Sequence, residues 1–197
     1  MEIVTARLAL RRPVVSDLDA IYEIHHDREA CHHNPSDLLA TRTDAENLYA
    51  RWDDHWRRHS FGYWVVTAGE ERTILGFCGL KFVRFRDREV LNLFYRFAPT
   101  AWGAGVATEA ATAVVRWADE HLPDWPILAR VRPDNIASQK VAQRAGLTRA
   151  EALDEPGEDG LDWMYTTRWP AAEPRSDHPT GGVGQPSDAG TRRHGAA

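Results

Sequence analysis

The sequence predicts a mixed α/β fold, with an α+β order of elements, in which a mostly antiparallel sheet carries helices on both faces. Two features predict this fold. Strand-like and helix-like periodicities alternate along residues 3–169 in the order β-α-α-β-β-β-α-β-α-β-β. The three consecutive strands in the middle follow one another at hairpin spacing, whereas a doubly wound parallel sheet would place a helix between each pair.

Composition indicates one globular domain over residues 1–170 and a disordered tail over residues 171–197. The chain of 197 residues is 43% hydrophobic and 27% charged, enough for one full core. The tail is rich in Pro, Gly, Ser, Asp and His, and Val183 is its one large aliphatic residue. Tail residues therefore cannot contribute a core of their own.

The net charge of the chain and the lengths of its apolar runs indicate which partners and which location to expect. The net charge of −5 predicts no broad positive field for nucleic acid, and no run of 18 apolar residues predicts a membrane span. The first residues lack a secretory signal pattern, and Cys31 and Cys78 lack disulfide-framework or zinc spacing. We therefore expect a cytoplasmic protein without nucleic-acid or membrane partners, as a monomer or a homodimer.

The N-terminal third predicts one strand and two helices. Residues 3–12 alternate as a strand does, and Pro13 ends it. Ser16 is placed to cap the first helix, and Thr43 with Glu46 forms a capping box for the second. Apolar faces at helical spacing follow these starts: Leu18, Ile21, Tyr22 and His25 in the first helix, and Leu48, Trp52 and Trp56 in the second.

The middle of the chain predicts three strands joined by turns. Strand-like runs cover residues 61–67, 74–82 and 90–97, and Gly69 and Asp87 mark the turns between them.

Beyond the third of these strands, helices and strands alternate. A helix over residues 106–120 is apolar on most sides, as expected for a helix buried against a sheet. A short strand at residues 127–131 follows, and Asn135 opens a helix that Gly146 ends. Two final strands flank an acidic loop: residues 147–153 and 161–169.

The loop before the long helix is the most informative segment for function. Gly103 and Gly105 permit a positive φ and leave the backbone open to a ligand. The free N–H groups of the first helical turn then favour a phosphate. A plain strand-to-helix turn is the alternative for two glycines alone. A dinucleotide-binding oxidoreductase is another, but its fingerprint needs a glycine where Thr108 stands and places the loop after the first strand.

Four segments in order resemble one family. Residues 102–110, Trp-Gly-Ala-Gly-Val-Ala-Thr-Glu-Ala, resemble the W-G-x-G-x-A-T-E-A segment of GNAT N-acetyltransferases in their ribosomal-protein N-acetyltransferase-like (RimJ/RimL-type) branch. Residues 5–11 resemble that branch's opening strand, and residues 17–21 its first helix. Residues 135–147 resemble its N-x-x-S…G-F element, with Leu147 in place of Phe.

This resemblance implies the GNAT acyl-CoA N-acyltransferase fold, with a sheet splayed at its fourth strand by a bulge. Acetyl-CoA is the implied cosubstrate, and its pantetheine arm lies in the opening and pairs with backbone amides of that strand. Thr100 stands where the family often has Gln or Arg, which removes one charged contact with the pyrophosphate. The implied coenzyme-binding residues are Phe97, Ala98, Trp102, Gly103, Ala104, Gly105, Val106, Ala107, Thr108, Asn135, Ser138 and Lys140.

Direct transfer to a primary amine requires loss of an ammonium proton and stabilisation of the departing thiolate. The tyrosine that many GNAT enzymes use as an acid is replaced by Ala142, and the resemblance points to Ser138 facing the sulfur. The alternative is that Ser138 is an ordinary first-turn residue behind the N-cap Asn135. Glu155, in the acidic loop, is a candidate base, or else a surface acid.

The acceptor is expected to be a protein N-terminus or a small-molecule amine, attacked in a ternary complex. A non-catalytic acyl-CoA-binding module is the alternative function. We expect no metal, because the histidine pairs around Cys31 are adjacent in sequence and lack the i, i+4 spacing of a helical zinc site.

Overall fold

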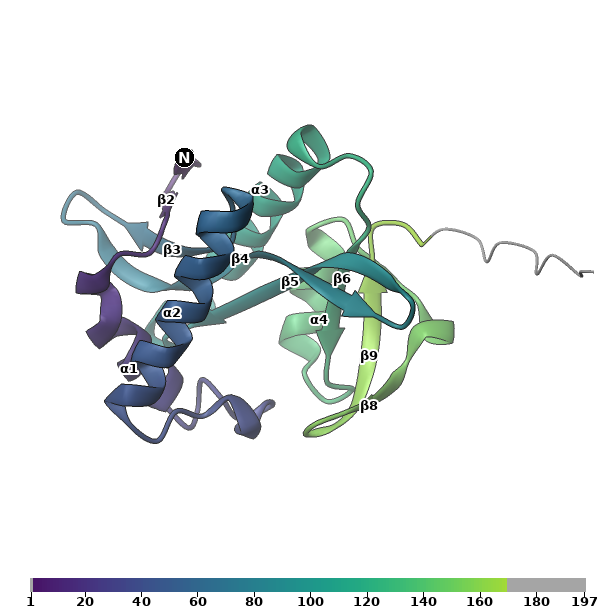
Figure 1. Cartoon of the computed structure of the whole chain (residues 1–197), viewed down its shortest axis with the longest axis horizontal. Coiled ribbons are helices and arrows are strands. Elements are labelled where there is room, and N and C mark those ends of the chain that lie inside the picture. The colour runs from purple at the N-terminus through teal and green to yellow at the C-terminus, as the bar shows by residue number, and fades with distance from the viewer. Residues whose placement is uncertain (1, 170–197) are drawn as a thin grey trace, which may run out of the picture.

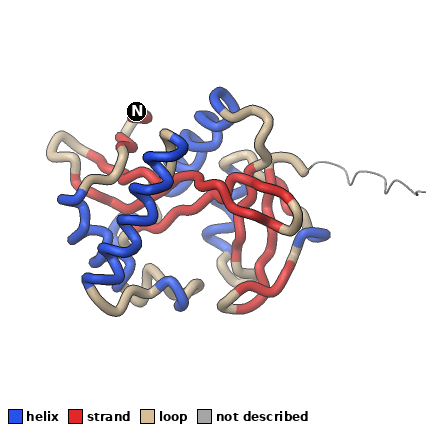
Figure 2. Tube along the Cα trace, in the orientation of Figure 1, coloured by secondary structure: helices blue, strands red, loops and turns tan. Residues whose placement is uncertain are grey.

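The computed structural model describes residues 2–169, which form a twisted mixed sheet covered by helices on both faces (Figures 1 and 2). The predicted mixed α/β architecture is confirmed. The strands lie in the order β1-β2-β3-β4-β5-β6-β9-β7, with β8 paired to β9, and every pair is antiparallel except β5–β6. The strands are β1 (Glu2–Val4), β2 (Leu8–Arg11), β3 (Tyr63–Ala68), β4 (Thr73–Phe85), β5 (Arg88–Phe97), β6 (Ile127–Val131), β7 (Thr148–Arg149), β8 (Glu155–Gly157) and β9 (Gly160–Thr166). The helices are α1 (Leu18–His26), α2 (Arg42–His59), α3 (Val106–His121) and α4 (Ile136–Arg144).

The opening strand is the first difference from the sequence prediction. Residues 3–12 form two strands that pair with each other, with Glu2 opposite Arg11. Thr5 causes the reversal, because its N–H donates to Leu8 O at 2.9 Å and its Oγ1 accepts from Leu8 N at 3.0 Å.

Both predicted helix starts were wrong by a residue or two. A 3-10 turn over Val15–Asp17 precedes α1, and near the start of each helix an aspartate accepts a backbone N–H. Asp17, and not Ser16, precedes α1, where its carboxylate accepts from Val14 N at 2.7 Å. Thr41 and Asp44 form the capping box of α2, with Asp44 accepting from Thr41 N at 2.8 Å.

The C-terminal strands also differ from the prediction. The expected strand over residues 147–153 shrinks to β7, because the Asp154 carboxylate bends the chain by accepting from Met164 N at 3.0 Å and Arg149 Nη1 at 2.7 Å. The acidic loop contains β8, which forms a hairpin with β9.

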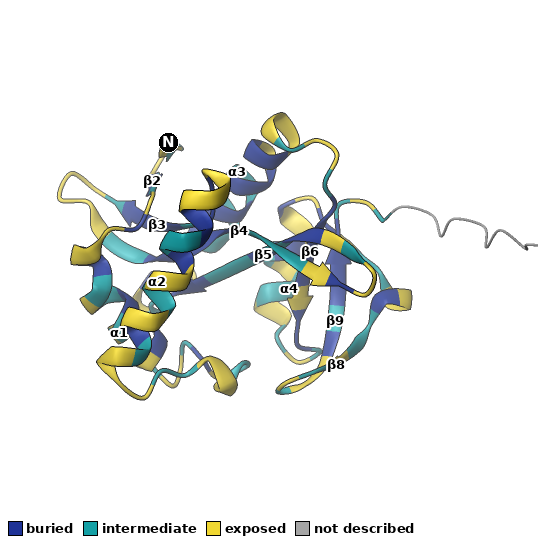
Figure 3. Ribbon diagram, in the orientation of Figure 1, coloured by how far each residue is buried: buried dark blue, intermediate teal, exposed yellow. Residues whose placement is uncertain are grey.

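Alternate residues of the central strands serve two separate cores, one on each face. Val65 and Phe77 pack with Ile21 of α1 and Trp52 of α2. Their neighbours Trp64, Val66, Cys78 and Leu80 pack with residues of α3 and α4. Buried residues accordingly concentrate in the central strands and on the inward sides of α2 and α3 (Figure 3).

The sheet forks between β5 and β6. These strands pair only at Leu91–Ile127 and Asn92–Leu128, although β5 continues to Phe97. Beyond this point β6 stays paired with β9 and leaves β5. The expected bulge is absent from the β4–β5 pairing, whose register is constant along its length. Divergence of β6 therefore opens the sheet without an extra residue in β5.

The predicted disordered tail, residues 171–197, lies outside the described residues. No helix in residues 2–169 is long and apolar enough to cross a membrane.

Candidate active site

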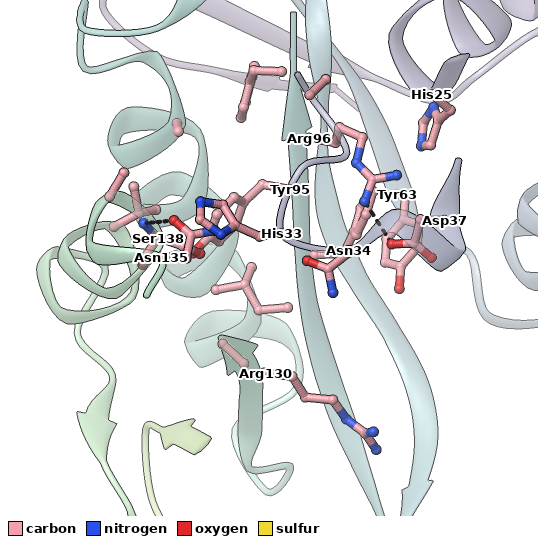
Figure 4. Close-up of a pocket in the computed structure, with 18 of the residues that line it drawn as sticks. His25, His33, Asn34, Asp37, Tyr63, Tyr95, Arg96, Arg130, Asn135 and Ser138 are labelled. Atoms are coloured by element: carbon pink, nitrogen blue, oxygen red, sulfur yellow. Dashed lines mark hydrogen bonds and ion pairs between the residues drawn. The ribbon is translucent and has the colours of Figure 1, made fainter. Parts of the chain in front are cut away.

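A pocket of about 840 Å³ lies at the fork and reaches both faces of the sheet. At one end it is lined by the glycine loop and α4, and at the other by α2 and the segment between α1 and α2. Figure 4 shows Asn135 and Ser138 on one side of the strands, and His25, Tyr63 and Asp37 on the other. Two molecules can therefore approach one point from opposite faces.

The glycine loop has the geometry that the sequence predicts. Gly103 and Gly105 adopt φ of +77° and +76°. A Cβ would meet no atom within 4 Å at Gly103, and at Gly105 only the Arg7 guanidinium at 3.6 Å. Backbone conformation, more than space, therefore requires glycine here. The first bond of α3 runs from Glu109 N to Gly105 O, which leaves three preceding N–H groups without a helical partner: Val106, Ala107 and Thr108.

The N-terminal segment fixes this loop. Arg7 donates from Nη1 to Ala104 O at 2.9 Å and from Nε to the Glu109 carboxylate at 2.7 Å. Thr5 Oγ1 donates to the same carboxylate at 2.6 Å. Ala104 thus contacts Arg7 through its carbonyl and does not line the pocket.

The backbone amides at the end of β5 differ in whether they have a partner within the sheet. Ala98 N donates to Leu75 O at 3.0 Å, so this amide is occupied and Ala98 does not line the pocket. Leu91 N faces β6, where it donates to Pro126 O. Because amides alternate along a strand, those of Tyr95 and Phe97 face the same side, where β6 has departed. The amides of Tyr95 and Phe97 therefore face the opening of the sheet, whereas the amide of Ala98 does not.

Trp102 covers the end of β5. Its Nε1 donates to Phe97 O at 3.1 Å, while about half of the residue remains exposed. The indole therefore lies at the pocket wall, where the sequence placed it among coenzyme contacts.

Ser138 has a partner that the sequence did not reveal. Asn135 is the N-cap of α4 and accepts from Ser138 N at 2.9 Å, as predicted. The Ser138 hydroxyl lies 2.6 Å from the hydroxyl of Tyr95, which also lies 3.0 Å from Ser138 O. Burial raises the pKa of Tyr95, although its bond with Ser138 opposes this, so the phenol stays protonated. Its position 43 residues away leaves no local sequence signal.

Lys140 and Arg144 line the pocket from the same helix, and Glu155 does not line it. Glu155 lies on β8, with Oε1 3.8 Å from Arg130 Nη2. Within residues 2–169, no three His, Cys, Asp or Glu side chains gather as a metal site would require.

Polar side chains gather on the α1–α2 side of the pocket. Arg96 is 7% exposed and pairs with Asp37 at 2.7 Å. Asn92 Nδ2 donates to the Tyr63 hydroxyl at 3.2 Å, and burial raises the pKa of Tyr63 to about 12. His25 Nδ1 lies 2.9 Å from Ile21 O and must donate to it, because a carbonyl only accepts. Burial, and then the Arg96 charge, lower the pKa of His25 to about 3, so the ring is neutral.

Hydrogen bonds join the α1–α2 segment to the β8–β9 hairpin. Ser36 donates from N and Oγ to Asp159 at 3.0 and 2.6 Å. Arg132 Nε donates to His33 O at 3.2 Å, and its Nη1 lies 3.0 Å from Asp162. His33 and Ser36 line the pocket, so this bridge holds together the α1–α2 side of its wall.

Comparison with known proteins agrees with this geometry. The family model of the acetyltransferase (GNAT) domain matches residues 7–148. The uncharacterized protein YkkB of Bacillus subtilis is 29% identical over 106 residues, which are 52% of this chain and 62% of YkkB. The chain thus spans less than two thirds of that relative.

Solved structures share the fold. An acetyltransferase from Agrobacterium tumefaciens superposes with a TM-score of 0.72 at 22% identity, covering 86% of this chain and 95% of that one. RimL, a ribosomal L7/L12 α-N-protein acetyltransferase in complex with coenzyme A, superposes with a TM-score of 0.67 at 17% identity, covering 84% and 97%. The chain belongs to the GNAT acetyltransferase family.

Proposed function

We propose that this protein moves the acetyl group of acetyl-CoA to a primary amine by direct attack within a ternary complex. One observation carries the proposal: a single pocket passes through the fork and reaches both the glycine loop and the α1–α2 side. Coenzyme and acceptor can therefore occupy the protein together and meet beside β5.

The coenzyme side is assigned from its donors. The free N–H groups of Val106, Ala107 and Thr108 form an anion site for the pyrophosphate at the start of α3. Lys140 and Arg144 add positive charge from α4. The amides of Tyr95 and Phe97 face the opening and suit the pantetheine arm, and one of them can donate to the thioester carbonyl.

Ser138 and Tyr95 serve the leaving thiolate. The Tyr95 hydroxyl has one proton, which it can donate to Ser138 Oγ or to Ser138 O. Donation to Oγ frees the serine proton for the sulfur. Ser138 then contacts the thiolate directly, and Tyr95 is a positioning residue that orients its hydroxyl.

The amine must lose its proton before it attacks. With a pKa of about 3, His25 is too weak a base to keep a proton from an amine of pKa about 10. We infer that the amine gives up its ammonium proton to the solvent and attacks as the neutral form, and that the proton then lost from the attacking nitrogen balances the charge of the departing thiolate.

Glu155 is testable as the alternative base. Because it lies off the pocket lining beside Arg130, we expect Glu155→Gln to leave kcat within about twofold of the wild-type value. Initial-rate kinetics against pH test this. A large loss of kcat, together with loss of the acidic limb of the pH–rate profile, would assign Glu155 the role of general base.

Release of free thiol from acetyl-CoA in the presence of an amine panel tests the function itself. Amine-dependent release, a product heavier by one acetyl group and intersecting double-reciprocal lines are expected. Tight coenzyme binding without amine-dependent release would favour a binding module, and parallel lines would exclude a ternary complex.

A further inference from the structure

The pocket is positively charged although the chain as a whole carries −5. Its lining acids are Glu29 and Asp37. Its lining cations are Arg51, Lys81, Arg96, Arg130, Lys140 and Arg144. This excess of positive charge favours an anionic occupant.

Two of the six cations have a counter-charge in the structure, and two more are assigned to the coenzyme. Arg96 pairs with Asp37, and Arg130 lies within 4.0 Å of both Glu155 and Asp162. Lys140 and Arg144 lie on α4 with Ser138, on the side assigned to the coenzyme phosphates.

Among the residues that the structure describes, Arg51 and Lys81 are the two lining cations that have neither a carboxylate partner nor an assigned coenzyme phosphate. Neither forms an ion pair or side-chain hydrogen bond with any part of the chain between residues 2 and 169. The carboxylates that follow Arg51 on α2 are already used, since Asp53 pairs with Arg12 and Asp54 with Arg58.

Lys81 lies at the fork and on the acceptor face. In β4 it is opposite Asn92, the last residue of β5 that pairs with β6. Its neighbours Leu80 and Phe82 pack into the core beneath α3. Because strand side chains alternate, Lys81 points to the opposite face, where α1 and α2 lie.

Arg51 approaches Lys81 from α2. It lines the pocket together with Leu48 and Trp52, one turn away and one residue away on the same helix. Burial, and then the charge of Arg51, lower the pKa of Lys81. Lys81 is half-buried and Arg51 is exposed at the pocket rim. Like charges repel, and an anion beside them removes that repulsion.

The coenzyme does not account for this pair. Its phosphates are assigned to the start of α3, which packs on the other face of the sheet from α1 and α2. An anion beside Lys81 must therefore arrive with the second substrate.

We propose that Lys81 and Arg51 bind an anionic group, a carboxylate or phosphate, that the amine acceptor itself carries. The preferred acceptor is then an amine with a nearby negative charge, and a polyamine is disfavoured because it would add positive charge. This inference rests on the proposed acetyl transfer and specifies its substrate class.

Matched acceptors test the inference in the full-length enzyme. Amino acids and short peptides with an acidic side chain are compared with the forms in which that side chain is an amide, and with spermidine. The acetyl-CoA concentration is held fixed. We expect kcat/KM for carboxylate forms to exceed that for the amides at least tenfold, and the ratio to fall as salt is raised. Equal rates for both forms, or a preference for spermidine, would overturn the inference while acetyl transfer stands.

Variants locate the effect. Lys81→Met should raise KM for the carboxylate acceptor at least tenfold, leave KM for its amide unchanged, and leave coenzyme affinity unchanged. Arg51→Gln should act in the same direction. Arg58→Gln, which removes an arginine on the same helix outside the pocket, is the matched control and should change none of these values.

The outcomes separate the two proposals. Equal losses for carboxylate and amide in Lys81→Met would assign Lys81 a structural role and overturn the inference, and melting curves of each variant report that loss independently. Absence of amine-dependent thiol release with every acceptor, despite coenzyme binding, would overturn the proposed function and this inference with it.

Discussion

Ser138 and Tyr95 have one hydroxyl proton each. In the proposed mechanism the departing thiolate accepts a hydrogen bond from the Ser138 hydroxyl. Ser138→Ala should lower kcat and kcat/KM together by roughly ten- to hundredfold, since a hydrogen bond to a charged group contributes about 1.5–3 kcal/mol. Acetyl-CoA affinity should hardly change. Single-turnover kinetics and calorimetry measure both quantities.

Tyr95→Phe, alone and combined with Ser138→Ala, gives a double-mutant cycle. It removes the hydroxyl that lies 2.6 Å from Ser138 Oγ, so it should lower kcat in the wild type and add little in the Ser138→Ala background. Additive losses would mean that Tyr95 does not act through Ser138. A lower melting temperature with normal kcat in both single variants would leave the pair only a structural role.

Two buried neutral histidines should make stability depend on pH. Burial chiefly lowers the pKa of His25 to about 3 and that of His55 to about 4. His55 Nδ1 donates to Phe61 O, and its Nε2 accepts from Phe82 N, a bond that protonation would break. Below pH 6.5 the unfolded histidines take up protons that the folded ones refuse, so stability is full above that pH and falls towards pH 4.

The expected slope is at most about 1.4 kcal/mol per pH unit for each histidine. Urea unfolding at pH 7 and pH 5 measures it. His25→Phe keeps an aromatic ring beside Phe77 and Phe94, and it should reduce the difference in unfolding free energy between the two pH values. An unchanged difference would show that His25 takes up its proton in the folded state too.

At the scale of elements, the glycine loop depends on its left-handed backbone. Gly103→Val or Gly105→Val should raise the acetyl-CoA dissociation constant at least tenfold, which is about 1.4 kcal/mol. Valine disfavours the positive φ at these positions, so the loop shifts and the N–H groups at the start of α3 no longer point at the pyrophosphate. Gly69→Val is the matched control. Gly69 has φ +73° with open space around it in the β3–β4 turn, so the same strain there should leave coenzyme affinity unchanged. Equal effects at the three positions would remove the loop from the site.

Elements with strong local periodicity could be predicted from the sequence. The β3–β5 strands, α3 and the positive φ at Gly103 and Gly105 follow from hairpin spacing, an apolar helix and two glycines. The split of the first strand at Thr5 could not be predicted, because one side-chain hydrogen bond decides it against the alternation.

The site was predictable only where its residues lie next to one another in sequence. The Asn135–Ser138 cap follows from local spacing, whereas the Tyr95–Ser138 contact needs the fork to bring β5 and α4 together. Occupation of the Ala98 amide by Leu75 likewise depends on the register between β4 and β5.

At the scale of the whole molecule, residues 171–197 should be dispensable. Their composition offers one large aliphatic residue, so they can add little apolar burial. A chain that ends at Pro170 should keep its melting temperature and its acetyl-CoA affinity, as scanning calorimetry and titration calorimetry can measure. A marked loss of either would assign the tail a contact with the domain or its pocket.

The bond from Arg7 to Ala104 joins residues 97 positions apart and couples the sheet edge to the glycine loop. Ligands stabilise whichever segments must be ordered for binding. When the coenzyme holds the loop, Arg7 and the strand pair β1–β2 behind it are held as well, although neither strand touches the ligand. The β1 edge of the sheet, where another chain could pair, therefore opens less often when the coenzyme is bound, and slower amide exchange at residues 2–11 is the signature of that coupling.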